Sequence, residues 1–366
     1  MSSATNHQAL VTGSRLHVSI TRTADRDSQE SGDERRTAGG DPTPPAAADR
    51  RVGTDHPVGA DHPVGSTDLR VGSMPLPEST QPLRVDWPYA ISLTVLHLLA
   101  LLAFLPYFFS WSGVVLGLVT YVACNMLGVT IGYHRLLTHR GFSCPRWFEH
   151  SLALCGMCTL QDSPARWVAI HRMHHQHSDR QEDPHSPMAS FWWSHFGWLL
   201  FRNRSHENLN RFERYARDLL RDPFYLGLER RMGWLVVYLA HTALIMAAGF
   251  AIGWWMTGVL SGGIRLMYSW LIWGVVIRTV ATLHITWAVN SVTHVWGYRN
   301  YDTRDNSRNN WWVALLAFGE GWHNNHHAHQ RSARHGHRWW EFDMSWMMIR
   351  LWERIGLVRD VVRPPR

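Results

Sequence analysis

The chain contains no lysine, so its net charge of +7 rests on arginine alone. We interpret this absence as the codon bias of a GC-rich genome rather than as a functional feature. The basic balance suits anionic lipid headgroups, an acyl thioester that carries phosphates, or an acidic redox partner. No nucleic-acid-binding motif accompanies the charge, so nucleic acid is not an expected partner.

Cysteine is also scarce, with four residues at Cys124, Cys144, Cys155 and Cys158. Cys155 and Cys158 have the C-x-x-C spacing of a redox or zinc pair, but they lie in an apolar stretch and no second pair accompanies them. We therefore interpret the cysteines as small, buried hydrophobic side chains.

The mean hydropathy of −0.22 is typical of a soluble protein. This average is misleading, because it combines a polar N-terminal segment with long apolar runs. Four runs approach or exceed the roughly 20 residues that cross a bilayer as a helix; they are Ala90–Trp111, Val114–Gly132, Trp234–Met256 and Leu266–Ala288. Trp and Tyr crowd their ends, as anchors at a membrane interface do. The runs form two hairpins, and we predict an all-α integral membrane protein with four transmembrane helices.

The distribution of arginine predicts how these helices are oriented. Residues 134–233 carry fourteen arginines, whereas the two short loops on the opposite side carry only Arg265. Because cytoplasmic loops are rich in arginine, we expect residues 133–233 and 289–366 to form a helical cap on the cytosolic face of a bacterial cytoplasmic membrane. Residues 1–82 are polar and poor in aromatic residues, so we predict a disordered tail there and a membrane domain at residues 83–366.

The chain has 24 histidines, and many of them fall in the predicted cap. The spacing His-x-x-His-His occurs twice, at His171, His174 and His175 and again at His323, His326 and His327. Positions i, i+3 and i+4 share one face of a helix, so we predict that each triplet directs three imidazoles at one spot. His134 and His139 are five residues apart, and they reach one site only near a frayed helix end or between converging metals.

Neutral imidazole suits iron, zinc, copper or nickel, and ten or so histidines exceed what one ion accepts. A structural zinc site needs only four ligands, usually with cysteine. A carboxylate-bridged di-iron bundle would show Glu-x-x-His on its helices, and none of the clusters does. We therefore predict a histidine-rich dimetal site at the membrane face, able to use dioxygen against an unactivated C–H bond.

Other histidines receive a different interpretation. His97 and His241 lie within apolar runs and are expected to be polar packing residues, whereas His335 and His337 are expected at the surface. Arg278 lies deep in the fourth run, and an intramembrane charge is a candidate functional residue. A membrane metal transporter or sensor is the alternative from another class, but its histidines should line a path within the spans.

The segments "HRLLTH", "HRMHH", "NSVTHVWGYRNYD" and "GEGWHNNHHAH" resemble the histidine boxes of the integral-membrane fatty acid desaturases, in particular a bacterial-type member of the stearoyl-CoA (Δ9 acyl-CoA) desaturase branch. The resemblance implies two iron ions and a separate electron donor of the ferredoxin or cytochrome b5 type with its reductase. It also implies nine histidine ligands, with Asn290 reaching a metal through water: His134, His139, His171, His174, His175, His294, His323, His326 and His327.

The same resemblance implies a bent tunnel for a long-chain fatty acyl substrate, whose kink matches Gln161, Trp167, Thr286 and Trp287. The implied reaction removes two hydrogens from the saturated chain and reduces O2 to water. Animal members carry an Arg-Asp pair before the second box, where this chain has Ala169 and Ile170. The acyl carrier therefore stays open among a CoA thioester, a carrier-protein thioester and a lipid ester. A related hydroxylase or oxygenase is the closest alternative activity.

Overall fold

The computed structural model describes residues 70–204, 209–230 and 232–365, so most of the predicted N-terminal tail lies outside the described residues. Residues 70–82, which we also expected in that tail, pack against the rest of the chain. The backbone N–H of Met74 donates to the carbonyl of Met188, and Thr80 is buried. The folded part therefore begins before residue 83.

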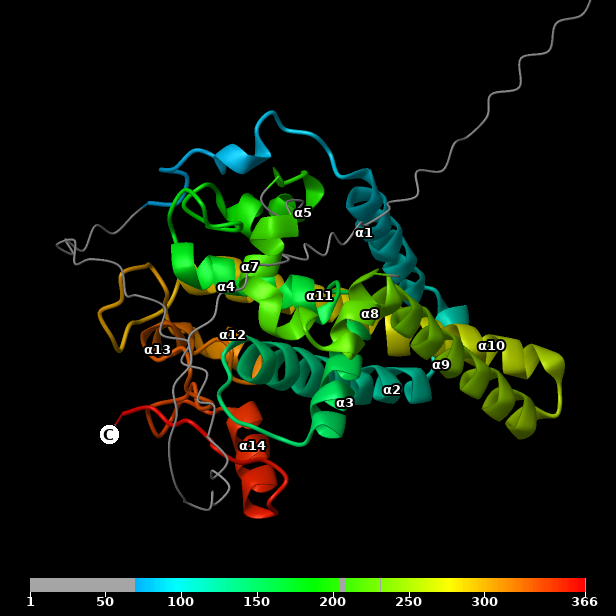
Figure 1. Ribbon diagram of the computed structural model, residues 1–366. Coiled ribbons are helices and arrows are strands. Elements are labelled where there is room, and N and C mark those ends of the chain that lie inside the picture. Colours follow the sequence, from blue (N-terminus) through cyan, green and yellow to red (C-terminus); the bar gives the residue numbers. More distant parts are fainter. Residues whose placement is uncertain (1–69, 205–208, 231, 366) are drawn as a thin grey trace, which may run out of the picture. The chain divides into compact units, whose positions relative to one another are not determined.

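The described residues are helical, and they contain isolated β-bridges but no strand (Figure 1). The spans are built from α1 (Trp87–Ala100), η2 (Leu101–Phe104), α2 (Trp111–Tyr121), η4 (Val122–Thr138), α9 (Gly233–Thr257), α10 (Leu260–Trp270), η6 (Leu271–Ile277), α11 (Arg278–Ser291) and η7 (Val292–His294). The remaining elements are η1 (Glu78–Thr80), η3 (Pro106–Phe108), α3 (Arg146–Met157), α4 (Pro164–His177), η5 (Trp193–Gly197), α5 (Trp198–Leu200), α7 (Leu209–Leu220), α8 (Pro223–Arg230), α12 (Trp311–Leu316), α13 (His323–Ala328) and α14 (Met344–Arg354).

Four helical segments within the described residues are long and apolar enough to cross a membrane, which confirms the predicted fold class. They are Trp87–Phe104, Trp111–Thr138, Gly233–Thr257 and Leu260–His294. The first segment ends earlier than expected, since Pro106 cannot occupy a helix interior. Trp111 belongs to the second segment instead, which starts after Ser110, whose hydroxyl accepts from the backbone N–H of Gly113 at 3.0 Å as an N-cap.

The second and fourth segments extend beyond the expected limits of the apolar runs. Their extra turns run through η4 and through α11 to η7, and both segments contain π-helical stretches, η4 and η6. π-helical turns are frequent at functional sites. These extensions carry His134 and His294 from the spans to the remaining histidines.

The spans pack closely through small residues and interhelical hydrogen bonds, as membrane helices do. A Cβ atom added to Gly253 would lie 2.6 Å from the carbonyl oxygen of Gly262, so α9 and α10 approach too closely for a larger side chain there. The hydroxyl of Thr120 in α2 donates to the carbonyl of Gly274 in η6 at 3.0 Å. These contacts fix the fourth span against the second and third.

The elements outside the spans form a helical cap. Helices α3, α4, α7 and α8 lie between the second and third spans in the chain, and α12, α13 and α14 follow the fourth. The cap packs on the end of the second span, where Tyr133 and Leu137 share a buried core with Val168 of α4 and Ile349 of α14. The cap therefore surrounds the end of the span that carries His134.

Candidate metal centre

The nine predicted histidine ligands gather into two buried clusters. One cluster contains His134, His139, His171, His175 and His326, and the other contains His174, His294, His323 and His327. In each cluster one nitrogen per residue lies within 4.8 Å of the others, and no ring is more than 9% exposed. The structure thus brings all nine residues together, as two sets of five and four nitrogen donors.

The prediction that each triplet points at one spot is wrong. His171 and His175 of α4 join the five-histidine cluster, where their Nε2 atoms lie 3.0 Å apart, whereas His174 faces the other cluster. Helix geometry explains this, because neighbouring residues project about 100° apart while positions i and i+4 nearly coincide. Each triplet therefore supplies two ligands to one cluster and one to the other.

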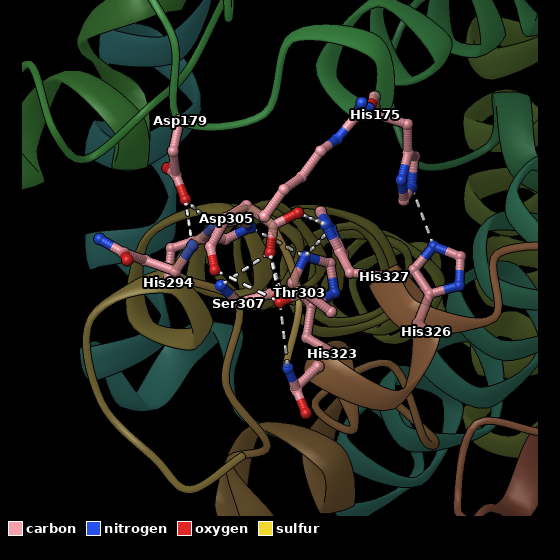
Figure 2. Close-up of polar contacts among 12 residues, drawn as sticks. His175, Asp179, His294, Thr303, Asp305, Ser307, His323, His326 and His327 are labelled. Atoms are coloured by element: carbon pink, nitrogen blue, oxygen red, sulfur yellow. Dashed lines mark hydrogen bonds and ion pairs between the residues drawn. The ribbon is translucent and has the colours of Figure 1, made fainter. Parts of the chain in front are cut away.

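The histidines of helix α13 are divided in the same way, but here two ligands join the four-histidine cluster and one joins the five-histidine cluster. His323 and His327 belong to the four-histidine cluster, and their Nε2 atoms lie 3.0 Å apart. His326 crosses to the five-histidine cluster, with its Nε2 atom 2.9 Å from that of His175, a contact seen in Figure 2. Helices α4 and α13 thus each supply ligands to both clusters.

His134 and His139 reach the same cluster because η4, which contains His134, is a π-helix that ends directly before His139. The backbone N–H of His139 donates to the carbonyl of His134 at 3.1 Å, a hydrogen bond between positions i and i+5. This π-type bond places residues five apart on one side. His139 directly follows the end of this helix at Thr138, which agrees with one of the two expected alternatives. The π-turn supplies a physical reason that spacing alone did not give.

Four buried carboxylates orient four of the histidines through Nδ1. The distances are 2.6 Å from His134 to Glu320, 3.0 Å from His174 to Asp183, 3.0 Å from His294 to Asp179 and 2.7 Å from His327 to Asp305. Figure 2 shows the Asp179 and Asp305 contacts. A carboxylate at Nδ1 holds the proton there and leaves Nε2 with a free lone pair toward the cluster. Sequence reasoning missed these acids, although Asp179 and Asp183 lie in "SDRQED", which begins three residues after the last histidine of the second box.

Electrostatics favour the neutral form of four of the rings and the ionised form of Asp305. Burial, together with the neighbouring histidines, lowers the pKa of His171, His175, His323 and His326 well below the usual value. Burial raises the pKa of the Asp305 carboxyl, but the adjacent His327 outweighs it and brings the pKa below the usual range. A neutral imidazole is the form that ligates metal.

His335 corrects another expectation, since it is buried rather than at the surface. It is 0% exposed, its Nδ1 lies 3.0 Å from Glu320, and its ring centroid is 4.5 Å from that of His326. Asp343 accepts from its backbone N–H at 2.8 Å and draws this loop inward. His337 is half-buried, with Nδ1 2.9 Å from the hydroxyl of Tyr301. The neighbouring arginines in "RHGHR" hid this burial from sequence reasoning.

Arg278, a candidate functional residue from its depth, is 1% exposed and donates from Nη1 to the carbonyl oxygen of Cys158 at the end of α3. A cation at a helix C-terminus is favourable. The structure thus gives this arginine a hydrogen bond to the end of α3, away from both histidine clusters.

A cavity of about 40 Å³ adjoins the five-histidine cluster, and its lining includes His134, His171 and Asn290. Among the predicted tunnel residues, Trp167 and Thr286 also line it. Gln161 links them, because its amide donates to Thr286 at 3.2 Å and accepts from the Trp167 indole at 3.2 Å. Trp287 is buried on another side of α11, with its ring centroid 5.1 Å from that of His284.

The donor set fits two metal ions. The Nε2 atoms of His139 and His174 are buried without a hydrogen-bond partner among the described residues. Buried polar atoms of this kind need an explanation, and a bound cation gives one. Nitrogen donors without thiolate suit iron and the neighbouring divalent metals.

Comparisons with known proteins agree with this site. The family model of the fatty acid desaturases matches residues 109–353. The chain is 44% identical over 288 residues to an sn-1 stearoyl-lipid 9-desaturase of Anabaena variabilis, covering 79% of this chain and 97% of that protein. An sn-1 stearoyl-lipid 9-desaturase of Synechocystis sp. is 43% identical over 79% of this chain and 85% of its own. An acyl-CoA 5-desaturase of Anemone leveillei is 43% identical over 74% and 77%. With four spans, clustered histidines and these matches, the chain belongs to the fatty acid desaturase family.

Proposed function

We propose that this desaturase inserts a cis double bond at carbon 9 of a saturated long-chain acyl group held in a membrane lipid. The observation that supports the proposal best is the cavity at the five-histidine cluster, which His134 and His171 line together with Thr286 and Trp167. An acyl chain that passes along this wall lies beside the nitrogen donors. Position 9 is supported by the two cyanobacterial relatives, which are named 9-desaturases.

Two iron ions, one in each histidine cluster, would supply the oxidising chemistry: O2 is reduced to two water molecules by two hydrogens from the acyl chain, two external electrons and two protons. The protein holds the ligands in the required tautomer through Glu320, Asp179, Asp183 and Asp305. The hydrogen-bonded row of Trp167, Gln161 and Thr286 fixes the wall of the cavity. A fixed wall sets which methylene pair lies next to the metals, which is proximity and orientation.

The acyl carrier is proposed to be a lipid ester. The two cyanobacterial relatives are named stearoyl-lipid desaturases, whereas the Anemone relative is named an acyl-CoA desaturase. Ala169 and Ile170 replace the Arg-Asp pair of animal members and are apolar. A CoA thioester carries phosphates that a cationic side chain would bind. The absence of the arginine at this position therefore favours the lipid ester.

The electron donor is proposed to be a separate acidic protein, of the ferredoxin or cytochrome b5 type with its reductase, that meets the cap from the cytosol. An open pocket of about 400 Å³ is lined by His327 of the four-histidine cluster and by Arg331 and Arg363. Its positive charge suits an acidic partner. The fourteen arginines of residues 134–233 support a cytosolic cap.

The test is expression in a bacterial host that supplies electrons, followed by gas chromatography and mass spectrometry of its separated lipids with double-bond location. We expect a new monounsaturated chain with its double bond at carbon 9 in the glycerolipid fraction. A hydroxy fatty acid would select the hydroxylase alternative instead. A new double bond that appears first in the acyl-CoA pool would contradict the lipid carrier.

A further inference from the structure

A third group of metal-ligating side chains lies apart from both histidine clusters. It contains Cys124 of η4, Cys158 directly after α3 and His241 of α9, and one sulfur or nitrogen atom of each lies within 4.8 Å of the others. Cys124 and Cys158 are 5% and 8% exposed. Three separate elements, two of them spans, therefore meet at two thiols and an imidazole.

This grouping differs from the one that the sequence suggests. The C-x-x-C spacing would pair Cys158 with Cys155, but the structure groups Cys158 with Cys124, 34 positions earlier in the chain. Cys155 is half-buried and is not part of the group. Packing of α3 on η4 brings Cys158 next to Cys124, and the spacing of the cysteines in the sequence does not predict this pair.

The surroundings of the thiols are polar, which their interpretation as hydrophobic filling does not explain. Arg278 reaches this group, because its Nη1 donates to the carbonyl oxygen of Cys158. Among the described residues, Nη2 of Arg278 and Nδ1 of His241 are buried without a hydrogen-bond partner. Nε of Arg278 donates to the carbonyl oxygen of Gly274, and this arginine forms no ion pair with a described carboxylate. An unpaired charge within a span is costly. With both thiols protonated, the group carries the +1 charge of Arg278 and lacks one negative charge to neutralise it.

The donor atoms favour a soft cation. Thiolates select Cu(I) and zinc among biological metals, and imidazole suits both. Bonds of about 2.3 Å to sulfur and about 2.0 Å to nitrogen place two ligands of one ion no more than about 4.6 Å apart. The separations within 4.8 Å thus require only small side-chain movements to close around an ion.

Charge balance decides between a monovalent and a divalent ion. Two thiolates carry −2, and Arg278 contributes +1, so one monovalent cation brings the group to zero. A divalent ion would leave +1 in a low-dielectric layer, which is penalised. On loading, the two thiol protons leave to solvent, as they do whenever cysteine ligates metal.

We propose that Cys124, Cys158 and His241 form a binding site for one soft monovalent cation of the Cu(I) class, with Arg278 as its balancing charge. This site is additional to the dimetal centre and independent of the proposed desaturation. A loaded site joins α3 of the cap to the second and third spans. Because the ion binds the folded state, it stabilises the protein by mass action.

The test uses the reduced, purified full-length protein with its histidine clusters already loaded with metal, and Cu(I) delivered from a bicinchoninate complex under anaerobic conditions. We expect one equivalent of Cu(I) per chain and a rise in Tm, both lost in Cys124→Ser and in Cys158→Ser. His241→Leu should weaken Cu(I) binding at least tenfold. Cys144→Ser is the matched control and should bind like the parent.

Two results would overturn the proposal. Equal Cu(I) uptake by the parent and by Cys124→Ser would place the ion elsewhere, for example at the histidines. Loss in Cys155→Ser with retention in Cys124→Ser would assign the ion to the C-x-x-C pair.

A second measurement needs no variant and so does not depend on variant folding. Alkylation of the parent protein, read by peptide mass spectrometry, should show Cu(I) protection at Cys124 and Cys158 but not at Cys144. An absence of protection at these two thiols would also overturn the site.

Discussion

Asp183→Asn isolates the contribution of one orienting carboxylate to the four-histidine cluster. Both oxygens of Asp183 lie 3.0 Å from Nδ1 of His174, and the side chain is 0% exposed. One oxygen also accepts from the backbone N–H of Asp179 at 2.9 Å and the other from that of His185 at 3.1 Å. An asparagine keeps the shape, but its amide donor must face one of these N–H groups, so one hydrogen bond is lost together with the charge.

The expected cost follows from these contacts. Loss of a partner that orients a ligating histidine lowers metal affinity about 10- to 100-fold, or about 1.4 to 2.7 kcal/mol. We expect Asp183→Asn to lower the metal affinity of the four-histidine cluster by this factor and to leave the metal affinity of the five-histidine cluster unchanged. The assay is chelator competition on the purified protein, with metal counted per chain.

The neighbouring residue supplies the control. Glu182→Gln removes the same charge one position earlier, but the Glu182 side chain is 63% exposed, so it should leave both affinities unchanged. Equal effects of the two substitutions would refute the orienting role of Asp183. Weakening of both ions by Asp183→Asn would refute the division into two clusters.

Three further predictions follow from the site. His174→Ala should abolish turnover while the protein still inserts in the membrane; retained product formation would remove His174 from the ligand set. Replacement of Thr286 should shift chain-length or positional preference in product analysis more than it changes metal content, and loss of bound metal would contradict its place in the wall of the cavity. Arg135→Leu should lower the free energy of unfolding by about 3 to 5 kcal/mol, because two buried carboxylates lose their ion-pair partner; chemical denaturation measures it, and a change under 1 kcal/mol would count against this.

The fold was largely predictable because hydropathy alone marks helices that cross a membrane. Each of the four apolar runs corresponds to one of the four spans. The predicted ends of the runs differ from the observed ends only where a particular residue or turn ends, caps or extends a helix. Pro106 ends the first helix, Ser110 caps the second, and π-turns carry the second span to Thr138. Such turns follow from hydrogen bonds between positions i and i+5, which leave no mark in composition.

The histidine ligands were identified from spacing and resemblance, but their arrangement was not. Spacing places the three histidines of a triplet on one side of a helix, but which cluster each of them joins depends on contacts between segments far apart in the chain, such as that of His175 with His326. The orienting acids and the buried His335 lie in loops, and loop conformation is set by distant contacts such as that of Asp343 with the His335 backbone. The grouping of Cys124 with Cys158 has the same origin.

Desaturation of an acyl group differs from its oxygenation in the atoms that the product has lost and gained. The most direct measurement is mass spectrometry of the product that the purified protein, supplied with O2 and a reducing ferredoxin system, forms from a lipid bearing one deuterium-labelled stearoyl chain. We expect a product that has lost one deuterium atom from carbon 9 and one from carbon 10 and gained no oxygen, with one product formed per O2 consumed. A product that has lost a single deuterium atom and carries an added oxygen atom would show oxygenation instead and would contradict desaturation.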